Sequence, residues 1–111
     1  MAREQPPRSL VVSGSWDDGD AVFNTGNPAK DEAMRRVNRS AVSVRARRQD
    51  AHLSVETVAR WAGLRRQTIS DFENGQSWAD AITVHQIATV LGFDSELRSD
   101  PRGRMGPQTQ G

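Results

Sequence analysis

Cysteine is absent from the 111-residue sequence, which excludes disulfides and thiolate metal sites. The two histidines, His52 and His85, have no group of potential metal ligands near them in the sequence. We therefore predict neither a metal site nor a cofactor. The sequence also lacks a recognisable nucleophile–base pair and a glycine-rich phosphate loop, so we do not expect an enzyme.

Long hydrophobic runs are absent as well. No stretch approaches the roughly 20 apolar residues of a membrane-spanning helix, and the first residues lack the continuous apolar segment of a secretion signal. We expect a cytoplasmic protein that does not associate with membranes. With 35% hydrophobic residues and a mean hydropathy of −0.69, the apolar residues suffice for one small core concentrated in part of the chain.

A strong excess of one charge is also missing, since the formal net charge is only +1. Net charge alone therefore does not indicate a nucleic-acid partner. The distribution is more informative, because residues 31–50 hold six arginines and three acidic residues, whereas residues 1–30 hold three basic and four acidic residues. The basic residues thus gather at the start of the segment with the clearest helical pattern.

Residues 1–30 and 98–111 have the composition of flexible segments. The first contains several prolines and glycines and carries the acidic sequence WDDGD between two short apolar stretches, which predicts a mostly disordered N-terminal arm. Trp16 and Phe23 of this arm could instead dock on a partner. The last residues mix proline, glycine, glutamine and charge, which predicts a disordered tail.

Between these ends, apolar residues recur at helical spacing. In the first run, steps of three and four residues place a set of side chains on one helix face: Met34, Val37, Ala41, Val44 and Arg48. Two interpretations of this run remain open. It can form a single helix from about Asp31, or it can break near Asn38 with Ser40 as the N-cap of a shorter helix.

Three further helices are predicted after this run. Ser54 can cap the second helix, and either Asp80 or Thr83 can cap the fourth. Their inward-facing residues are Val58, Ala59 and Ala62 in the second, Ile69 and Phe72 in the third, and Val84, Ile87, Ala88 and Leu91 in the fourth. The glycines that suit their ends are Gly63, Gly75 and Gly92. Short helices joined by a tight turn predict a small all-α bundle of four to five helices.

The helical segment contains an ordered set of residues at a characteristic spacing: Val44, Arg48, Leu53-Ser54, Ala59, Gly63, Thr68-Ile69-Ser70, Phe72-Glu73-Asn74-Gly75, Ile87-Ala88 and Leu91-Gly92. Together they resemble the Cro and phage-repressor family of helix-turn-helix domains, also called XRE. The resemblance implies a lambda-repressor-like bundle within residues 31–97, best matched over residues 44–93. It also implies that the partner is double-stranded DNA.

In this family the third helix, here about residues 65–73, enters the major groove. The resemblance places Arg66 and Gln67 in base-reading positions, with Asp71 one turn further on. The chemistry agrees, because arginine can donate to guanine O6 and N7, and glutamine can pair with adenine N6 and N7. A carboxylate at Asp71 could accept from cytosine N4, although it would also repel phosphates.

The resemblance implies contacts with the DNA backbone for a second group, Ser54, Arg65, Thr68, Ser70, Asn74 and Gln76. The chain departs from the family in the loop after Gly75, which is often basic in relatives but reads QSWADA here. Part of the usual phosphate contact is therefore missing or supplied elsewhere, by Arg45, Arg47 or the arginines near residues 35–39.

Arg48 and Glu73 occupy positions that the family often joins by an ion pair between the first and third helices. Such a pair would orient the reading helix. Arg48 could alternatively contact a phosphate. Trp78, in the loop after the third helix, fits either an interface or packing against the arm.

The leading hypothesis is a transcriptional regulator, preferably a repressor, that binds a near-palindromic operator as a homodimer. Phe93 and Leu97 are the candidates for dimer contacts. The alternative is an antitoxin or adaptor whose arm, including Trp16 and Phe23, binds a protein partner while the domain autoregulates its operon. A third hypothesis is a helical interaction module that has lost DNA binding.

Overall fold

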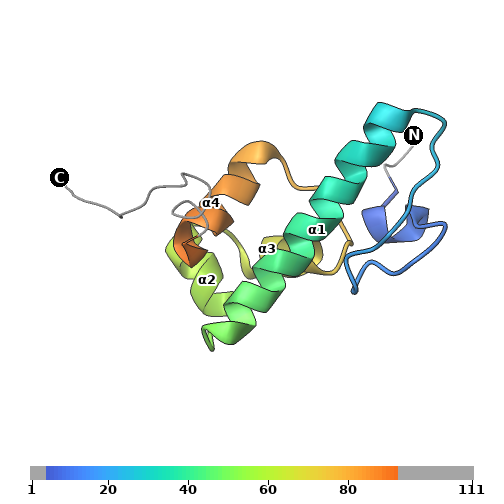
Figure 1. The fold of residues 1–111 in the computed structure, drawn as a ribbon. Coiled ribbons are helices and arrows are strands. Elements are labelled where there is room, and N and C mark those ends of the chain that lie inside the picture. The colour runs from blue at the N-terminus through green and yellow to red at the C-terminus, as the bar shows by residue number, and fades with distance from the viewer. Residues whose placement is uncertain (1–4, 93–111) are drawn as a thin grey trace, which may run out of the picture.

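The computed structural model describes residues 5–92, which form an all-α bundle. It contains a short 3₁₀ helix, η1 (Pro7–Leu10), and four α-helices, α1 (Pro28–Asp50), α2 (Val55–Ala62), α3 (Arg66–Glu73) and α4 (Ala81–Leu91). Figure 1 shows the long α1 with α2 and α4 on one side and the N-terminal segment, in blue, on the other. The predicted fold class is confirmed; Phe93, Leu97 and the predicted tail lie outside the described residues.

α1 is one uninterrupted helix of 23 residues, which decides between the two interpretations of its sequence. Its N-cap is Asn27, whose side-chain oxygen accepts hydrogen bonds from the N–H groups of Ala29 and Lys30. Pro28 suits the first turn, because the N–H that it lacks would have no partner within the helix. Ser40 is therefore an exposed residue in the middle of α1 rather than a cap.

Local capping determines where α2 and α4 begin and end. The Ser54 hydroxyl accepts from the Thr57 N–H at 3.0 Å and caps α2, while Asp80 rather than Thr83 caps α4, accepting from the Thr83 N–H at 2.7 Å. Gly63 ends α2 at a φ of 73°, a left-handed conformation that favours glycine. The predicted start and end of α2 are confirmed.

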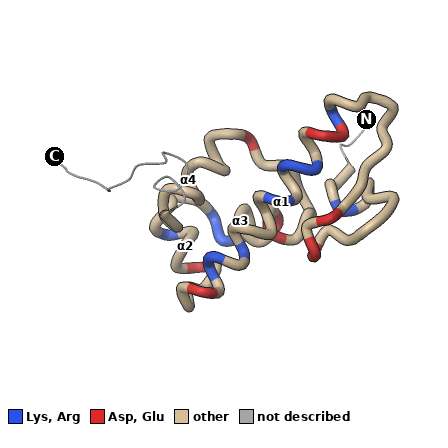
Figure 2. The backbone as a smooth tube through the Cα atoms, viewed as in Figure 1, with Lys and Arg blue, Asp and Glu red and all other residues tan. Residues whose placement is uncertain are grey.

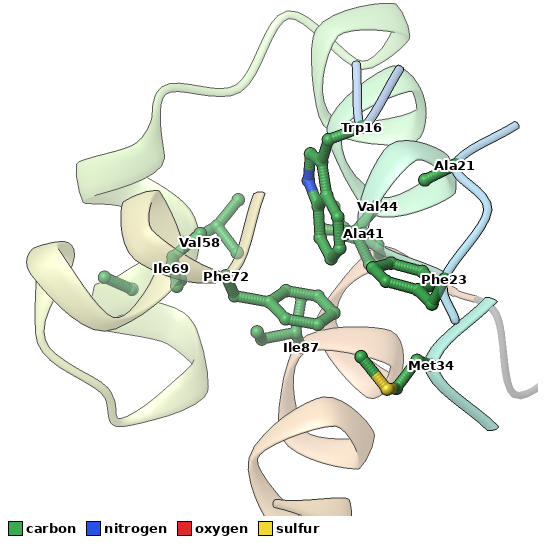
Figure 3. Packing of buried hydrophobic residues seen from close by; sticks show 12 residues of the cluster. Trp16, Ala21, Phe23, Met34, Ala41, Val44, Val58, Ile69, Phe72 and Ile87 are labelled. Atoms are coloured by element: carbon green, nitrogen blue, oxygen red, sulfur yellow. The ribbon is translucent and has the colours of Figure 1, made fainter. Parts of the chain in front are cut away.

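The core lies where the three shorter helices meet α1. Figure 3 shows Ile69 and Phe72 of α3 at its centre with Val58 of α2 and Ile87 of α4. None of these four side chains is more than 1% exposed. Burying a side chain of this size stabilises the fold by about 1.5–3 kcal/mol. α3 is too short to be stable alone and is held in place by this packing.

Residues 5–27 pack against the bundle, which differs from the flexible arm predicted from composition. Trp16, Ala21 and Phe23 are 2%, 3% and 4% exposed and belong to the same hydrophobic cluster as α1 and α3. Figure 3 shows the Trp16 and Phe23 rings pointing into this cluster. Composition did not predict this packing. The few apolar side chains of the segment are buried against α1 and α3, and their burial offsets the entropy lost when a polar segment is ordered.

A buried amide on α1 fixes the N-terminal segment. Asn38 is 0% exposed, and its side-chain nitrogen donates to the Trp16 carbonyl at 2.8 Å while its oxygen accepts from the Ala21 N–H at 3.1 Å. A buried amide without partners would destabilise the core, but here both ends are satisfied. The hydrogen bonds explain why an asparagine lies among the apolar residues of α1.

Candidate nucleic-acid interface

α3 buries one face and exposes the other. Ile69 and Phe72 lie in the core, whereas Arg66 and Gln67 in the first turn are exposed. The preceding residue, Arg65, is the exposed N-cap, and its side chain makes no capping hydrogen bond. The start of α3 therefore presents two guanidinium groups and an amide beside the positive end of the helix dipole, an arrangement suited to anions and to hydrogen-bonding edges.

Gln67 is held by Asp71, one turn further along α3. The Gln67 Nε2 donates to Asp71 Oδ1 at 2.7 Å. This bond uses one of the two N–H groups and leaves one N–H donor and the amide oxygen acceptor for another partner. Asp71 is half-buried, and its carboxylate orients the amide.

The residues expected to contact the DNA backbone have unequal access to the surface. Ser54 is exposed and engaged as the cap of α2, and Gln76 is exposed just after α3. Thr68 is half-buried. Ser70 and Asn74 are half-buried as well, and the Asn74 Nδ2 donates to Ser70 Oγ at 3.4 Å. The exposed members of the group therefore lie beyond the ends of α3 rather than along it.

Arg48 of α1 and Glu73 at the end of α3 form a bidentate ion pair. The Arg48 Nε donates to Glu73 Oε2 at 2.8 Å and Nη2 donates to Oε1 at 2.9 Å. The remaining nitrogen, Nη1, donates to the Leu53 carbonyl at 2.9 Å. The two side chains are 13% and 3% exposed, and hydrogen bonding to the carboxylate raises the pKa of Arg48. With all three nitrogens engaged inside the protein, Arg48 orients α3 rather than contacting a phosphate.

A family model described as a helix-turn-helix domain matches residues 41–100, more than half of the chain. The chain belongs to this helix-turn-helix family. α2 and α3, joined at Gly63, are the two helices of its DNA-binding motif. Searches of curated proteins and of solved structures gave no match.

Two features are missing from the part of the helix-turn-helix protein that the structure describes. None of the helices between residues 5 and 92 combines the length and apolar character needed to span a membrane. Over the same range, the histidine, aspartate and glutamate side chains form no group of three that could hold a metal ion.

The arginines of α1 have acceptors within the described part of the helix-turn-helix domain, although several of them share one carboxylate. Three of them pair with the single carboxylate of Glu32, at 2.9–3.6 Å: Arg35, Arg36 and Arg39. Arg45 contacts Asp17 at 3.4 Å, and Arg47 donates to the Leu91 carbonyl at 3.4 Å. In Figure 2 the acidic residues of α1 lie near its two ends, with the arginines between them. The arginines expected to replace the missing basic loop thus have partners within the domain.

Two residues contact the end of α3 in a way that was not predicted from the sequence. Trp16 Nε1 donates to the Glu73 carbonyl at 3.0 Å, and Arg8 Nη1 donates to the Asn74 carbonyl at 2.6 Å. The backbone N–H of Arg8 also donates to the Gly75 carbonyl at 2.8 Å. The only indication in the sequence was the presence of apolar and aromatic residues in an otherwise polar segment.

Proposed function

We propose that this helix-turn-helix protein is a sequence-specific transcriptional regulator of the Cro and phage-repressor kind, with α3 as the helix that reads the major groove. The observation that carries the proposal is the orientation of α3, because Ile69 and Phe72 are buried while Arg66 and Gln67 project from its first turn. An α-helix with side chains is about 10–12 Å wide, which fits a major groove about 12 Å wide.

Arg66 and Gln67 are the proposed base-reading residues. Arg66 can donate two hydrogen bonds to guanine O6 and N7. Gln67 can pair with adenine, and its hydrogen bond to Asp71 reduces the entropy lost when the amide is oriented toward a base. The other carboxylate oxygen of Asp71 is a proposed acceptor for cytosine N4.

The proposed phosphate contacts flank the groove. Ser54 lies at the N-terminus of α2, where backbone N–H groups and the helix dipole favour an anion. Arg65 supplies a positive charge at the entrance to α3, and Gln76 supplies a donor after its end. Three further residues, which are half-buried, are also proposed to contact the DNA backbone: Thr68, Ser70 and Asn74.

The proposed form on DNA is a homodimer that represses transcription. One reading helix contacts only a few base pairs, so a second copy about 34 Å away, in the next major groove, would multiply the sequence information that is read. A dimer placed across a promoter would then exclude other proteins from the same site. The resemblance to phage repressors supports this choice of dimer and repressor.

Selection of bound duplexes from a random library tests the proposed function. We expect enrichment of two related half-sites about 10 base pairs apart, centre to centre. Recovery of no preferred sequence, together with no electrophoretic shift of random duplex at low salt, would contradict the proposal. That result would favour an interaction module without DNA binding.

Replacing Arg66 with alanine should weaken binding to the selected duplex by about 1–3 kcal/mol and relax the preference at one base pair. Fluorescence anisotropy on a panel of single-base variants of the duplex measures both effects. Arg36→Ala, on a 74% exposed side chain of α1, is the matched control for loss of one charge. An equal loss on every duplex would instead make Arg66 a phosphate contact.

No observation favours the antitoxin or adaptor function. That alternative depends on free apolar groups at Trp16 and Phe23, and both side chains are buried. Trp78 is also engaged with this segment, because its Nε1 donates to the Gln5 carbonyl at 3.2 Å. The N-terminal segment therefore binds its own bundle through the residues that were expected to reach a partner.

A further inference from the structure

We infer that Arg8 and Trp16 are positioning residues for DNA reading, because the N-terminal segment holds the C-terminal end of α3 and so sets the angle at which its first turn meets a duplex. The inference rests on the proposed function. It concerns a part of the chain that lies outside the family match, which begins at residue 41.

The hydrogen bonds at the end of α3 are the first observation. A helix leaves its last carbonyl groups without partners in the helix. Here the carbonyls of three successive residues, Glu73, Asn74 and Gly75, accept from the Trp16 indole, the Arg8 guanidinium and the Arg8 backbone N–H. α3 has no basic residue in its own last turn, so Arg8 supplies the cation that favours the negative end of its dipole.

The packing of Trp16 on Gly75 is the second observation. Gly75 has a φ of 69°, and a Cβ atom built there would lie 2.7 Å from the indole ring. Only glycine allows the ring to approach the backbone so closely at this left-handed position. The contact places a rigid, 2% exposed aromatic side chain directly against the residue that follows α3.

The N-terminal segment that contacts α3 is itself anchored on α1. Asn38 binds the backbone of Trp16 and Ala21. Asp17 accepts from Arg8 at 2.6 Å and contacts Arg45 of α1 at 3.4 Å. Together with the Arg48–Glu73 ion pair, these contacts fix one end of an eight-residue helix whose other end carries the proposed base-reading side chains.

The surroundings of Arg8 distinguish a positioning residue from a phosphate contact. Its Nη1 is bound to the Asn74 carbonyl and its Nη2 to Asp17, both at 2.6 Å. Asp18 and Asp20, which follow Asp17 closely in the chain, are exposed and add negative charge to this segment. Both terminal nitrogens of Arg8 are therefore engaged by acceptors of the protein, on a side chain that is 37% exposed.

The test compares Arg8→Ala and Arg8→Lys with Val12→Ala, a control at a residue of the same segment that is 63% exposed. Each full-length variant is assayed well below its melting temperature for affinity, base preference and salt dependence. Lysine keeps the charge but lacks the planar guanidinium that donates to the Asn74 carbonyl and to Asp17 at the same time. We expect both Arg8 variants to lose about tenfold on the selected duplex, with relaxed preference at the positions read by Arg66 and Gln67.

Affinity for random duplex and the salt dependence should stay unchanged in the same variants. A loss shared by all duplexes, with the slope of log K against log salt smaller by about 0.9, would overturn the inference and make Arg8 a phosphate contact. Unchanged affinity and preference would also overturn it and leave a purely structural role. If the Arg8 variants do not fold, Trp16→Phe removes the indole donor while keeping an aromatic ring.

Hydrogen exchange without DNA separates failure of the inference from failure of the proposed function. In the wild type the amides of Asn74, Gly75 and Gln76 are bonded within the end of α3. We expect them to exchange faster in Arg8→Ala, with the amides of α2 unchanged and Val12→Ala like the wild type. Unchanged exchange at the three amides overturns the inference at its structural step. Faster exchange in a protein that binds no duplex rejects the proposed function and with it the role in DNA reading, while the hold of Arg8 on the end of α3 stands.

Discussion

At the scale of single residues, Arg48 and Glu73 show how one contact sets the orientation of a helix. They lie 25 positions apart in the chain and join α1 to the end of α3. A carboxylate that is only 3% exposed requires a partner, because removal from water is costly for a charge. The ion pair is therefore part of the fold and part of the geometry of the candidate interface.

Replacing Glu73 with glutamine should lower the free energy of unfolding by about 3–5 kcal/mol, because it leaves the charge of Arg48 buried and uncompensated. The remaining exposure of Arg48, 13%, favours the lower end of that range. Chemical denaturation measures the change. Glu32→Gln, which breaks exposed ion pairs on α1, is the control and should cost no more than about 1 kcal/mol. Equal effects of the two substitutions would contradict this account.

Asp17 should contribute to stability in a pH-dependent way. The hydrogen bond from Arg8, opposed by partial burial and assisted by the charges of Arg8 and Arg45, lowers the pKa of Asp17 below its ordinary value of 3.8. The pKa of Asp17 is therefore lower in the folded chain than in the unfolded chain. Its ionised carboxylate stabilises the fold at pH values above the unfolded-state pKa, and this stabilisation is lost as the pH falls through the folded-state pKa.

The Asp17→Asn variant should therefore lose less stability than the wild type when the pH is lowered from about 5 to 2. At neutral pH the cost should be at most about 1 kcal/mol, because solvent screens an exposed ion pair. Denaturation curves at several pH values measure this difference. Asp18→Asn removes the same charge one residue away, and an identical pH profile for the two variants would reject the role of Asp17.

At the scale of elements, α2 and α3 contain eight residues each and depend on their caps and on packing. The cap Ser54 and the end of α2 at Gly63 follow from local rules that operate within four residues, and both were predicted correctly. The cap of α4 was predicted as either Asp80 or Thr83, and the structure shows Asp80. The length of α1 was left open, because the partners of the buried Asn38 lie outside the helix, 17 and 22 positions earlier in the chain.

Ser54 allows the capping and phosphate-binding roles of one position to be separated. Ser54→Ala should cost about 1 kcal/mol of stability, because the Thr57 N–H loses its acceptor. Ser54→Asp should keep the cap and the stability but weaken binding to every duplex, since it places a negative charge beside the phosphate. Melting curves and anisotropy measure the two effects, and a DNA affinity unaffected by aspartate would remove Ser54 from the proposed interface.

At the scale of the whole molecule, the N-terminal segment extends the bundle beyond the residues that the family model matches. The match begins in the middle of α1, whereas the core includes Trp16, Ala21 and Phe23. A chain that begins at Thr25 would keep the cap of α1 but expose the core face that these side chains cover. The domain that folds is therefore larger than the domain that the family describes.

Removal of residues 1–24 should lower the free energy of unfolding by about 3–6 kcal/mol, the contribution of two buried aromatic side chains. Urea denaturation of the shortened and full-length chains measures the difference. A chain that lacks only residues 1–4 is the control and should match the full length. Equal stability of all three chains would show that the N-terminal segment does not contribute to the core.

The sequence by itself determined the helix-turn-helix motif. Ser54, Gly63, Ile69 and Phe72 act through caps, turns and helical periodicity, all of which depend on near neighbours in the chain. The position of Arg66 and Gln67 on the exposed face follows from that periodicity.

Only the tertiary structure shows where the N-terminal segment packs and which groups the α1 arginines contact. Trp16 is buried because α1 and the end of α3 happen to offer it a surface and a carbonyl acceptor, and Arg8 caps carbonyls more than 60 positions away. Such contacts join residues that no local pattern relates, because their free energy comes from surfaces that exist only once the helices have packed.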